Sequence, residues 1–296
     1  MNHFEAAAGA RPRPALLQTQ QGPVQYHSSG DGPALLALHG GMGGYDQSLL
    51  LAGALLGRSS GLRVIALSRP GYLGTPLGSC LTPEAQADLY VEVLDSLGID
   101  KARIAAVSAG GPSALQFAIR HPSRCAALIL VSACSGRLST PPSILSRLRV
   151  MRLLTLIPGL SALLRRRVRR SPERAMTRSI PDAATRASVL AHPDAGRLML
   201  SLQDSVFDAL PRRIAGTIND IERFAALEPI PFERILAPTL VVHGTADKIV
   251  APAHGESVAN AVPGAELMSI PGGRHVALVT HLDLVRARVA AFLGIA

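Results

Sequence analysis

A serine that could serve as a nucleophile stands at Ser108, within the stretch AVSAG (residues 106–110). The apolar run Ile104–Val107 before it predicts a strand, and the segment Pro112–Ile119 after it predicts a helix. A sharp turn between a strand and a helix holds a serine hydroxyl in the open at the end of a sheet. The helix N-terminus would also favour negative charge developing beside that hydroxyl. The motif therefore predicts nucleophilic catalysis by Ser108, although a tight turn in any α/β protein has the same pattern.

Two further residues that suit acid–base chemistry follow predicted strands later in the chain. Asp247 lies in the loop HGTAD after the strand Thr239–Val242, and His275 lies in the loop PGGRH after the strand Glu266–Ile270. A lone loop aspartate is usually a turn former, and a lone loop histidine is usually a solvated side chain. Together with Ser108, however, they supply a nucleophile, a general base and a carboxylate that could orient the base. We therefore expect a serine-dependent catalytic site.

The predicted strands and helices alternate, which places these three residues at one edge of a sheet. Short apolar runs at Ala34–Leu38, Leu62–Leu67 and Ala126–Val131 are typical of strands covered on both faces. Helices are expected at about 47–56, 83–97, 253–260 and 282–292, with Thr82 as the N-cap of the second. This alternation predicts an α/β fold with a mostly parallel sheet, in which ligand sites lie beyond the carboxyl ends of the strands.

The alternation is interrupted at two places. Residues up to about Gln21 carry no clear pattern and are expected to lack structure, and Pro23–His27 could form an edge strand. From Ser135 to about Glu233 the chain is helical in tendency, rich in arginine and without a strand pattern. We predict a core of residues 1–134 and 235–296 and a helical cap of residues 135–234.

The predicted cap should cover Ser108, because it leaves the sheet after one core strand and returns before the next. Its arginines cannot enter an apolar pocket unpaired without a large desolvation cost, so most of them, Arg165, Arg166 and Arg167 included, should face solvent. The apolar side chains expected to pack on the core are Leu153, Leu154, Ile157, Leu160, Leu163 and Leu164.

Five stretches of the sequence together resemble the α/β-hydrolase fold with a helical cap. They are HGG (39–41), SRPGY (68–72), VSAGG (107–111), VHGTAD (242–247) and PGGRH (271–275), and the order Ser, Asp, His along the chain is also that of the family. The stretches cover both core segments but not the insertion. The resemblance implies a triad of Ser108, His275 and Asp247, and an oxyanion hole formed by the N–H groups of Ala109 and of Gly41 or Met42. It gives His39 a structural role.

The resemblance also narrows the reaction. Epoxide hydrolases and haloalkane dehalogenases of this fold carry an aspartate where this chain has Ser108, and the halide-binding tryptophan of the dehalogenases is absent. Carbon–carbon bond hydrolases typically have a tryptophan where Val276 stands, and the GxSWG elbow of proline iminopeptidases is missing. An ester, thioester or lactone hydrolase without a metal or other cofactor remains. The alternatives are a cofactor-free haloperoxidase-like enzyme and a ligand-binding protein that keeps the triad without turnover.

Charge in this chain is concentrated in the predicted cap. Of the net charge of +9, +8 falls between Arg137 and Arg234, where 17 arginines face 9 acidic residues. Aromatic residues make up only 3% of the chain, so stacking platforms for single-stranded nucleic acid are missing and no nucleic-acid partner is expected. The resemblance implies a small ester-like substrate as the partner. An interfacial helix at Leu145–Leu164, with the arginines of residues 165–170 meeting anionic lipid, is a further hypothesis. Packing of cap helices on the core explains these residues equally well.

The remaining features set limits on location and on other kinds of site. No apolar run approaches the ~18 residues of a membrane span, and the N-terminal segment lacks the apolar core of a secretory signal, so we expect a cytoplasmic protein. Cys80, Cys125 and Cys134 show no spacing typical of a disulfide framework or a zinc site. His254 and His281 do not follow a predicted strand and are interpreted as helix-surface residues.

Overall fold

A sheet of eight strands forms the centre of the protein, whose computed structural model describes residues 12–57, 61–155, 157 and 159–295. The strand order is β1-β2-β4-β3-β5-β6-β7-β8, antiparallel between β1 and β2 and between β2 and β4, and parallel elsewhere. The mostly parallel sheet expected from the sequence is confirmed. The strands are β1 Ala15–Thr19, β2 Gly22–Ser29, β3 Ala34–Leu38, β4 Arg63–Leu67, β5 Ala102–Val107, β6 Cys125–Val131, β7 Thr239–Gly244 and β8 Glu266–Ile270.

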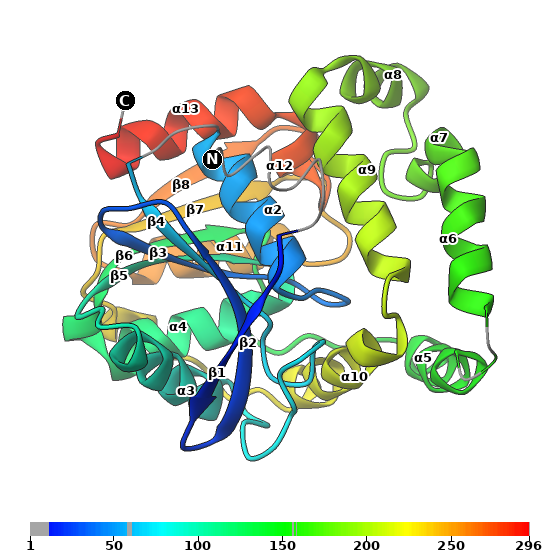
Figure 1. The fold of residues 1–296 in the computed structure, drawn as a ribbon. Helices are drawn as coiled ribbons and strands as arrows, with labels where there is room; N and C mark the ends of the chain where they lie inside the picture. Colours follow the sequence, from blue (N-terminus) through cyan, green and yellow to red (C-terminus); the bar gives the residue numbers. More distant parts are fainter. Residues whose placement is uncertain (1–11, 58–60, 156, 158, 296) are drawn as a thin grey trace.

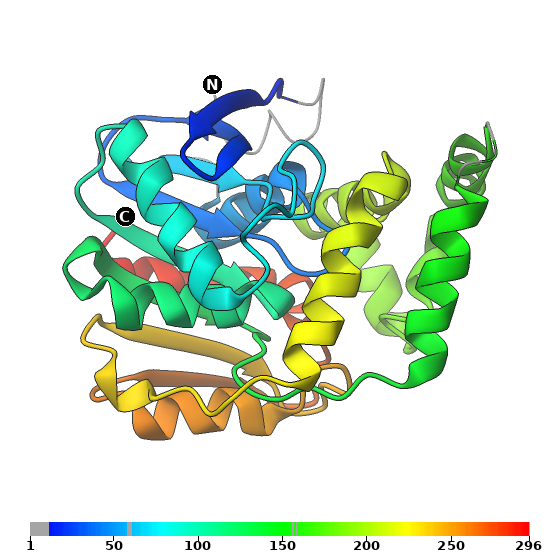
Figure 2. The ribbon, with the colours of Figure 1, turned by 90° about the horizontal axis from the view of Figure 1, so that it is seen from below.

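Helices cover both faces of the sheet because its central strands are apolar on both faces (Figures 1 and 2). Leu35 and Leu36 are neighbours on β3, point to opposite faces and are both fully buried. The face of Leu36 is covered by α3 (Pro83–Ser96), α4 (Gly111–Arg120) and α11 (Pro252–Ala261). The face of Leu35 is covered by α2 (Tyr45–Leu56), α12 (Ala277–Thr280) and α13 (Leu282–Leu293). Because helices pack on both faces of the sheet, the parallel strands are held in place. The loops that follow these strands therefore start from fixed positions.

Local sequence signals succeed at one helix start and fail at the N-terminal hairpin. Thr82 caps α3 as predicted, since its Oγ1 accepts a hydrogen bond of 3.3 Å from the Ala85 N–H. The expectation that residues up to Gln21 lack structure is wrong for Ala15–Thr19, which form the edge strand β1; its remaining part, residues 1–11, lies outside the described residues. The hairpin closes at Gly22, whose φ of 114° favours glycine.

An insertion of six helices separates β6 from β7 within the described residues and lies to the right of the sheet in Figure 1. None of the helices in the described ranges is long and apolar enough to cross a membrane. The inserted helices are α5 Pro142–Leu154, α6 Leu160–Arg170, α7 Pro172–Met176, α8 Ala183–Ala191, α9 Pro193–Phe207 and α10 Pro211–Ala225. Below we call residues 135–234 the insertion.

The inserted helices meet the core differently from the expectation. Leu153, Leu154, Ile157 and Leu163 were expected to pack on the core, but they are 66, 46, 53 and 63% exposed. The reason is that α9 and α10 occupy the core-facing layer, where Leu198 of α9 joins the core beneath it. Helix α6 packs on α9, and α5 packs on α10. The outer two helices therefore keep apolar side chains in solvent.

One of the three arginines expected to face solvent is partly withdrawn from it. Arg165 of α6 donates to Asp204 Oδ1 of α9 at 2.7 Å, and also pairs with Asp208. Arg166 and Arg167 are exposed as expected. Arg165 thus helps to hold α6 against α9.

Candidate active site

Ser108 lies directly after β5, where the chain turns into the short helix η1 (Ser108–Gly110) and then α4. Its φ is +53°, a left-handed conformation that costs a non-glycine residue free energy and that occurs often at functional sites. Backbone crowds this turn: a Cβ at Gly110 would lie 2.8 Å from the Leu38 carbonyl oxygen, and one at Gly111 would lie 2.2 Å from that of Cys134. Only glycines at these two positions allow the turn that presents the serine.

Ser108, His275 and Asp247 form one hydrogen-bonded chain. The Ser108 Oγ lies 3.0 Å from His275 Nε2, and His275 Nδ1 lies 2.8 Å from Asp247 Oδ2. Ser108 and His275 are 167 positions apart in the sequence, and they meet because β5, β7 and β8 end at the same edge of the sheet. The structure thus brings together the three residues that the sequence singled out.

The Asp247 carboxylate is held by more than the histidine. Its side chain is fully buried, and its Oδ1 accepts hydrogen bonds from the N–H groups of Ile249 (2.8 Å) and Val250 (3.0 Å). Burial alone would raise the pKa of Asp247, but the hydrogen bond and charge of His275, with the two N–H donors, lower that pKa below its ordinary value. The carboxylate therefore stays ionised and can fix the orientation of the imidazole.

The glycine-rich loop after β3 lies against Ser108. A Cβ at Gly40 would lie 3.0 Å from the Ser108 Cβ, so a larger residue here would have to push the serine or the loop aside. In the described residues, the N–H groups of Gly41 and Ala109 donate no hydrogen bond outside regular helices and strands. The Met42 N–H, in contrast, donates to Thr217 Oγ1 at 2.9 Å. Of the three expected oxyanion donors, Gly41 and Ala109 are therefore available, whereas Met42 is engaged by the insertion.

His39, at the start of this loop, is fully buried and does not contact the triad. Its Nε2 accepts a hydrogen bond of 2.9 Å from the Arg69 N–H, so the ring proton sits on Nδ1 and is donated to the Gly40 carbonyl oxygen at 2.6 Å. Burial, together with the nearby charge of Arg69, lowers the pKa of His39 well below its ordinary value. His39 is thus a neutral residue that braces the loop, in agreement with the structural role expected for it.

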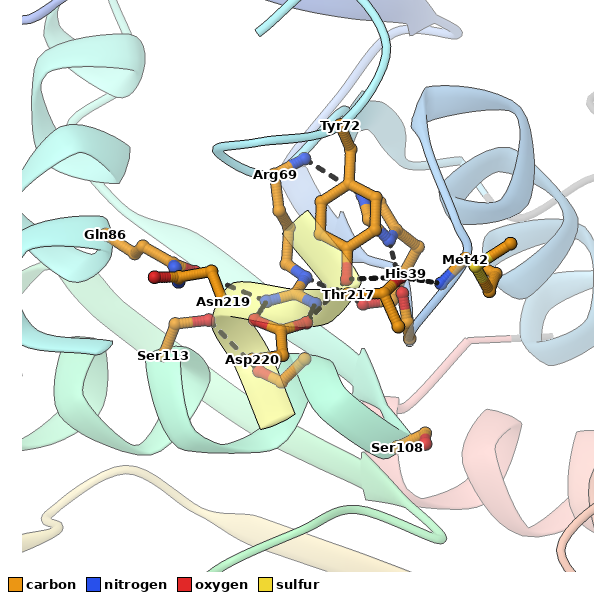
Figure 3. Close-up of polar contacts among 12 residues, drawn as sticks. His39, Met42, Arg69, Tyr72, Gln86, Ser108, Ser113, Thr217, Asn219 and Asp220 are labelled. Carbon is orange, nitrogen blue, oxygen red and sulfur yellow. Dashed lines mark hydrogen bonds and ion pairs between the residues drawn. The ribbon is translucent and has the colours of Figure 1, made fainter. Parts of the chain in front are cut away.

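A buried polar network joins this loop to helix α10 of the insertion (Figure 3). Arg69 is 1% exposed; its Nε donates to the His39 carbonyl oxygen at 2.9 Å, and its Nη2 pairs with Asp220 Oδ2 at 2.5 Å. The Tyr72 hydroxyl donates to the same Asp220 oxygen at 2.6 Å and lies 3.3 Å from Thr217 Oγ1. The network therefore links the loop after β3, the loop after β4 and α10.

Helix α10 is fixed to the core by two further contacts. Arg213, which is fully buried, pairs with Asp46 of α2 at 2.6 Å. Gly216 donates its N–H to the Gly71 carbonyl oxygen at 2.9 Å, and a Cβ at Gly216 would lie 2.3 Å from the Tyr72 ring. These contacts hold α10 tightly against the core of the protein.

A cavity of about 200 Å³ opens beside Ser108 and His275. Its walls come from the glycine loop, α2, α9 and the start of α12. Apart from Ser108 and His275, Gln47 is the only polar side chain among the described residues that line it. The apolar wall residues are Leu50, Leu51, Ala54, Val107, Leu198, Leu202, Val276, Leu278 and Val279. The cavity can accept an apolar group bound to a carbonyl at Ser108.

A larger cavity, of about 420 Å³, lies away from the triad. It is bounded by the two ends of the insertion and by α11, and it includes Ser135 and His254. His254 is on α11 as expected, but its Nδ1 accepts a hydrogen bond of 3.2 Å from the Ser135 N–H, so it is not a free surface residue. His281 lies between α12 and α13. Among the described residues, no group of three or more His, Cys, Asp or Glu side chains is arranged to hold a metal ion.

Comparison with known proteins places this architecture in a family. A family model described as "alpha/beta hydrolase fold" matches residues 33–282, which include the sheet from β3 onward, the residues Ser108, Asp247 and His275, and the insertion. The chain belongs to the α/β-hydrolase family. A solved α/β-hydrolase fold protein from Nakamurella multipartita is 36% identical, with a TM-score of 0.77 over 95% of this chain and 99% of that one. The family resemblance read from the five sequence stretches is therefore confirmed.

Curated relatives of the family match more weakly. The hydrolase YcgS of Bacillus subtilis is 34% identical over 122 residues, 40% of this chain and 41% of that protein. The first relatives in the comparison are thus covered over less than half of their length. A 2-hydroxy-6-oxo-6-phenylhexa-2,4-dienoate hydrolase of Burkholderia cepacia is 26% identical over 92% of this chain and 91% of its own. These relatives are hydrolases, and they do not fix the bond that this member cleaves.

Sequence reasoning missed the residues that attach the insertion to the glycine loop. Thr217 and Asp220 lie on an ordinary amphipathic helix, and their partners Met42 and Tyr72 are 175 and 148 positions away. Arg69 stands within a stretch that did carry the family resemblance, but the sequence offered no sign of its buried partner. The only available signal was the presence of acidic and small residues on one side of an otherwise apolar helix face.

Proposed function

We propose that this α/β-hydrolase cleaves a carboxylic ester, thioester or lactone through an acyl-enzyme on Ser108. The hydrogen-bonded chain from Ser108 through His275 to Asp247 carries the proposal, because it joins a nucleophile, a general base and an orienting carboxylate. His275 accepts the Ser108 proton as the hydroxyl oxygen attacks the carbonyl carbon, and it returns that proton to the leaving oxygen or sulfur. Water then attacks the acyl-enzyme by the same route, which releases the acid and restores Ser108.

The negative charge that forms on the carbonyl oxygen is stabilised by the backbone around Ser108. The N–H groups of Ala109 and Gly41 are the proposed donors, since the loop holding Gly41 is pressed against the serine. Such donors typically lower the barrier by about 3 kcal/mol each. Helix α4 begins two residues after Ala109 and adds the positive end of its dipole. The proposed oxyanion hole consists of backbone groups only. The strength of its hydrogen bonds therefore depends on the conformation of the loop that holds Gly41.

The cavity indicates a neutral and small acyl group. Its volume of about 200 Å³ is below the ~300–1,000 Å³ of pockets that take drug-sized ligands. No arginine or lysine is among the described residues that line it, and an unpaired carboxylate would lose its hydration there without compensation. The Burkholderia cepacia relative is named for a dienoate, which is an anion. We therefore propose a neutral ester-type substrate for this protein in place of a dienoate.

Turnover of a nitrophenyl ester series tests the proposal. The protein should hydrolyse the acetate and butyrate esters, and Ser108→Ala should lose at least about 10³-fold in kcat because nucleophile and base act as a unit. Ser113→Ala is the matched control: Ser113 is a buried serine of the adjoining helix that hydrogen-bonds Tyr90 and takes no part in the triad. Its activity should stay near that of the wild type. Equal turnover by wild type and Ser108→Ala would overturn the assignment of Ser108 as the nucleophile. No turnover by a folded wild type would overturn the proposed reaction and favour a binding protein.

A further inference from the structure

The outer helices of the insertion expose an unusual number of apolar side chains around the α5–α6 connection. Val150 is 55% exposed, Leu153 66%, Ile157 53% and Leu163 63%. Single exposed apolar residues are normal on a protein, whereas several that lie together can form an interaction surface. These four fall within 14 positions of the sequence. The side chains belong to the end of α5, the following turn and the start of α6.

The same helices carry only positive charge. Residues 142–170 contain eight arginines and no acidic residue. Among the described residues, no carboxylate lies within ion-pair distance of Arg166, Arg167 or Arg170, and all three are exposed. Arg165 differs, since it pairs with two aspartates of α9 and anchors the helix. The exposed apolar group is thus accompanied by uncompensated positive charge.

Both kinds of side chain are exposed on the two outer helices of the insertion. Helices α5 and α6 lie on the far side of the insertion from the sheet, with α9 and α10 between them and the core (Figures 1 and 2). The half-buried positions of α6, Leu160, Leu164 and Val168, follow a spacing of four residues and face inward. Leu163, Arg166, Arg167 and Arg170 of the same helix are exposed. We call Val150, Leu153, Leu154, Ile157 and Leu163, with Arg166, Arg167 and Arg170, the α5–α6 face.

We propose that the α5–α6 face docks on the surface of a membrane that contains anionic lipids. Exposed leucines on one side of a helix pair can enter the boundary between headgroups and acyl chains, while arginines beside them contact lipid phosphates. The helices are too short and too charged to cross the bilayer, so they lie on it. The proposal concerns a surface remote from Ser108 and does not depend on the reaction proposed above.

The charge distribution favours a lipid surface over the other partners that could cover apolar side chains. A two-fold dimer through this face would bring the arginines of one copy against those of the other, because such an interface pairs a patch with itself. Like charges facing each other across an interface oppose association. Nucleic acid would attract the arginines but offers no apolar medium for Leu153, Ile157 or Leu163. An anionic bilayer offers an apolar layer for the exposed apolar side chains and phosphate groups for the arginines.

Co-sedimentation with liposomes tests the proposal directly. The full chain should bind vesicles of phosphatidylcholine and phosphatidylglycerol in a 3:1 ratio and bind pure phosphatidylcholine at least about tenfold more weakly. Binding should fall when salt is raised from 0.1 to 0.5 M, because salt screens the arginines from the headgroups. Binding that is equal on neutral and anionic vesicles, or absent from both, would overturn the proposal.

Matched variants separate the two halves of the face. Arg166→Gln with Arg167→Gln should weaken binding by about 25-fold, at roughly fivefold for each arginine near the surface. Arg166→Lys with Arg167→Lys keeps the charge and should bind nearly as well as the wild type. Leu153→Ser with Leu163→Ser should weaken binding by at least about tenfold. The control Leu236→Ser with Leu284→Ser alters two leucines that are 75 and 57% exposed elsewhere, and it should change nothing.

The oligomeric state of the protein without lipid tests whether a second copy of the chain covers the α5–α6 face instead of a membrane. By sedimentation velocity the chain should be monomeric at micromolar concentration without lipid. A dimer that dissociates in the Leu153→Ser, Leu163→Ser variant would show that a second copy covers the face, and it would overturn the membrane proposal. Circular dichroism should confirm that every variant remains folded, which is expected because all the altered side chains are exposed.

Discussion

Thr217 of the insertion accepts a hydrogen bond of 2.9 Å from the backbone N–H of Met42, a residue of the glycine loop beside Ser108. The hydroxyl of Thr217 in turn donates to the Arg213 carbonyl oxygen within α10, at 2.9 Å. Helix α10 therefore holds the segment that presents the Gly41 N–H. The insertion acts on the candidate active site through the loop backbone, in addition to contributing to the cavity wall.

Replacing Thr217 by valine removes this acceptor at nearly constant volume. The partly buried Met42 N–H then loses its partner, which typically costs about 0.5–1.5 kcal/mol and allows the loop to shift. We expect kcat for a neutral ester to fall about tenfold with KM within about twofold, because an oxyanion donor acts mainly in the transition state. Thr217→Ser retains the oxygen and should rescue kcat. An unchanged kcat in Thr217→Val would show that the loop keeps its geometry without α10.

The Arg69–Asp220 pair should be a strong determinant of stability. Because both side chains are at least 95% buried, Asp220→Ala leaves an uncompensated charge and should lower the unfolding free energy by about 3–5 kcal/mol. Urea denaturation measures this change. The control is Glu222→Gln on the same helix, which breaks the exposed pair with Arg149 and should cost at most about 0.5 kcal/mol. Similar losses in the two variants would contradict the importance assigned to burial.

Acid should destabilise the fold through His39. Its pKa in the folded protein lies below that in the unfolded chain, so the unfolded state takes up a proton that the folded state excludes. This contribution to stability is complete above the ordinary histidine value of about 6.5 and is lost as the pH falls below it, by about 1.4 kcal/mol per pH unit. Histidine NMR should show a ring that stays neutral, with its proton on Nδ1, at pH values where an ordinary histidine is already protonated. A His39 signal that titrates near pH 6.5 in the folded protein would contradict this assignment.

The cavity wall should set the length of the acyl group. Leu202 of α9 lines the cavity, so Leu202→Ala should enlarge it and raise the octanoate-to-butyrate ratio of kcat/KM by about tenfold, the discrimination expected for one or two methylene groups. Leu200, two residues away on the same helix, is 41% exposed and does not line the cavity. Leu200→Ala should leave the ratio unchanged. If both variants behave alike, the acyl group binds elsewhere.

The parts of the fold that sequence could predict are those set by short-range patterns. Each of Ser108, Asp247 and His275 follows an apolar strand and stands in a loop of small residues, so strand order and family resemblance suffice to bring them together. Gly41 stands in a similar loop after β3, and its role as an oxyanion donor stays a prediction. The hairpin strand Ala15–Thr19 was missed because its edge position leaves it mostly exposed, without the apolar run that marks a buried strand.

The arrangement of the insertion could not be predicted because it depends on contacts far apart in the chain. Leu153, Leu163, Leu198 and Leu202 are all leucines in helical segments, and the sequence pattern does not distinguish them. Leu153 and Leu163 are nevertheless exposed, whereas Leu198 and Leu202 face the core and the cavity. Which helix layer meets the sheet is decided by specific partners such as Asp220 for Arg69 and Asp46 for Arg213. Helical periodicity carries no information about those pairings.

Trapping the nucleophile is the most direct measurement of the proposed chemistry. A fluorophosphonate should react with the wild-type protein at one site, and peptide mass spectrometry should place the adduct on Ser108, which the proposed mechanism activates through His275. Ser108→Ala should remain unlabelled while Ser113→Ala is labelled like the wild type. An adduct on a different residue, or equal labelling of Ser108→Ala, would contradict the assignment of Ser108 as the nucleophile.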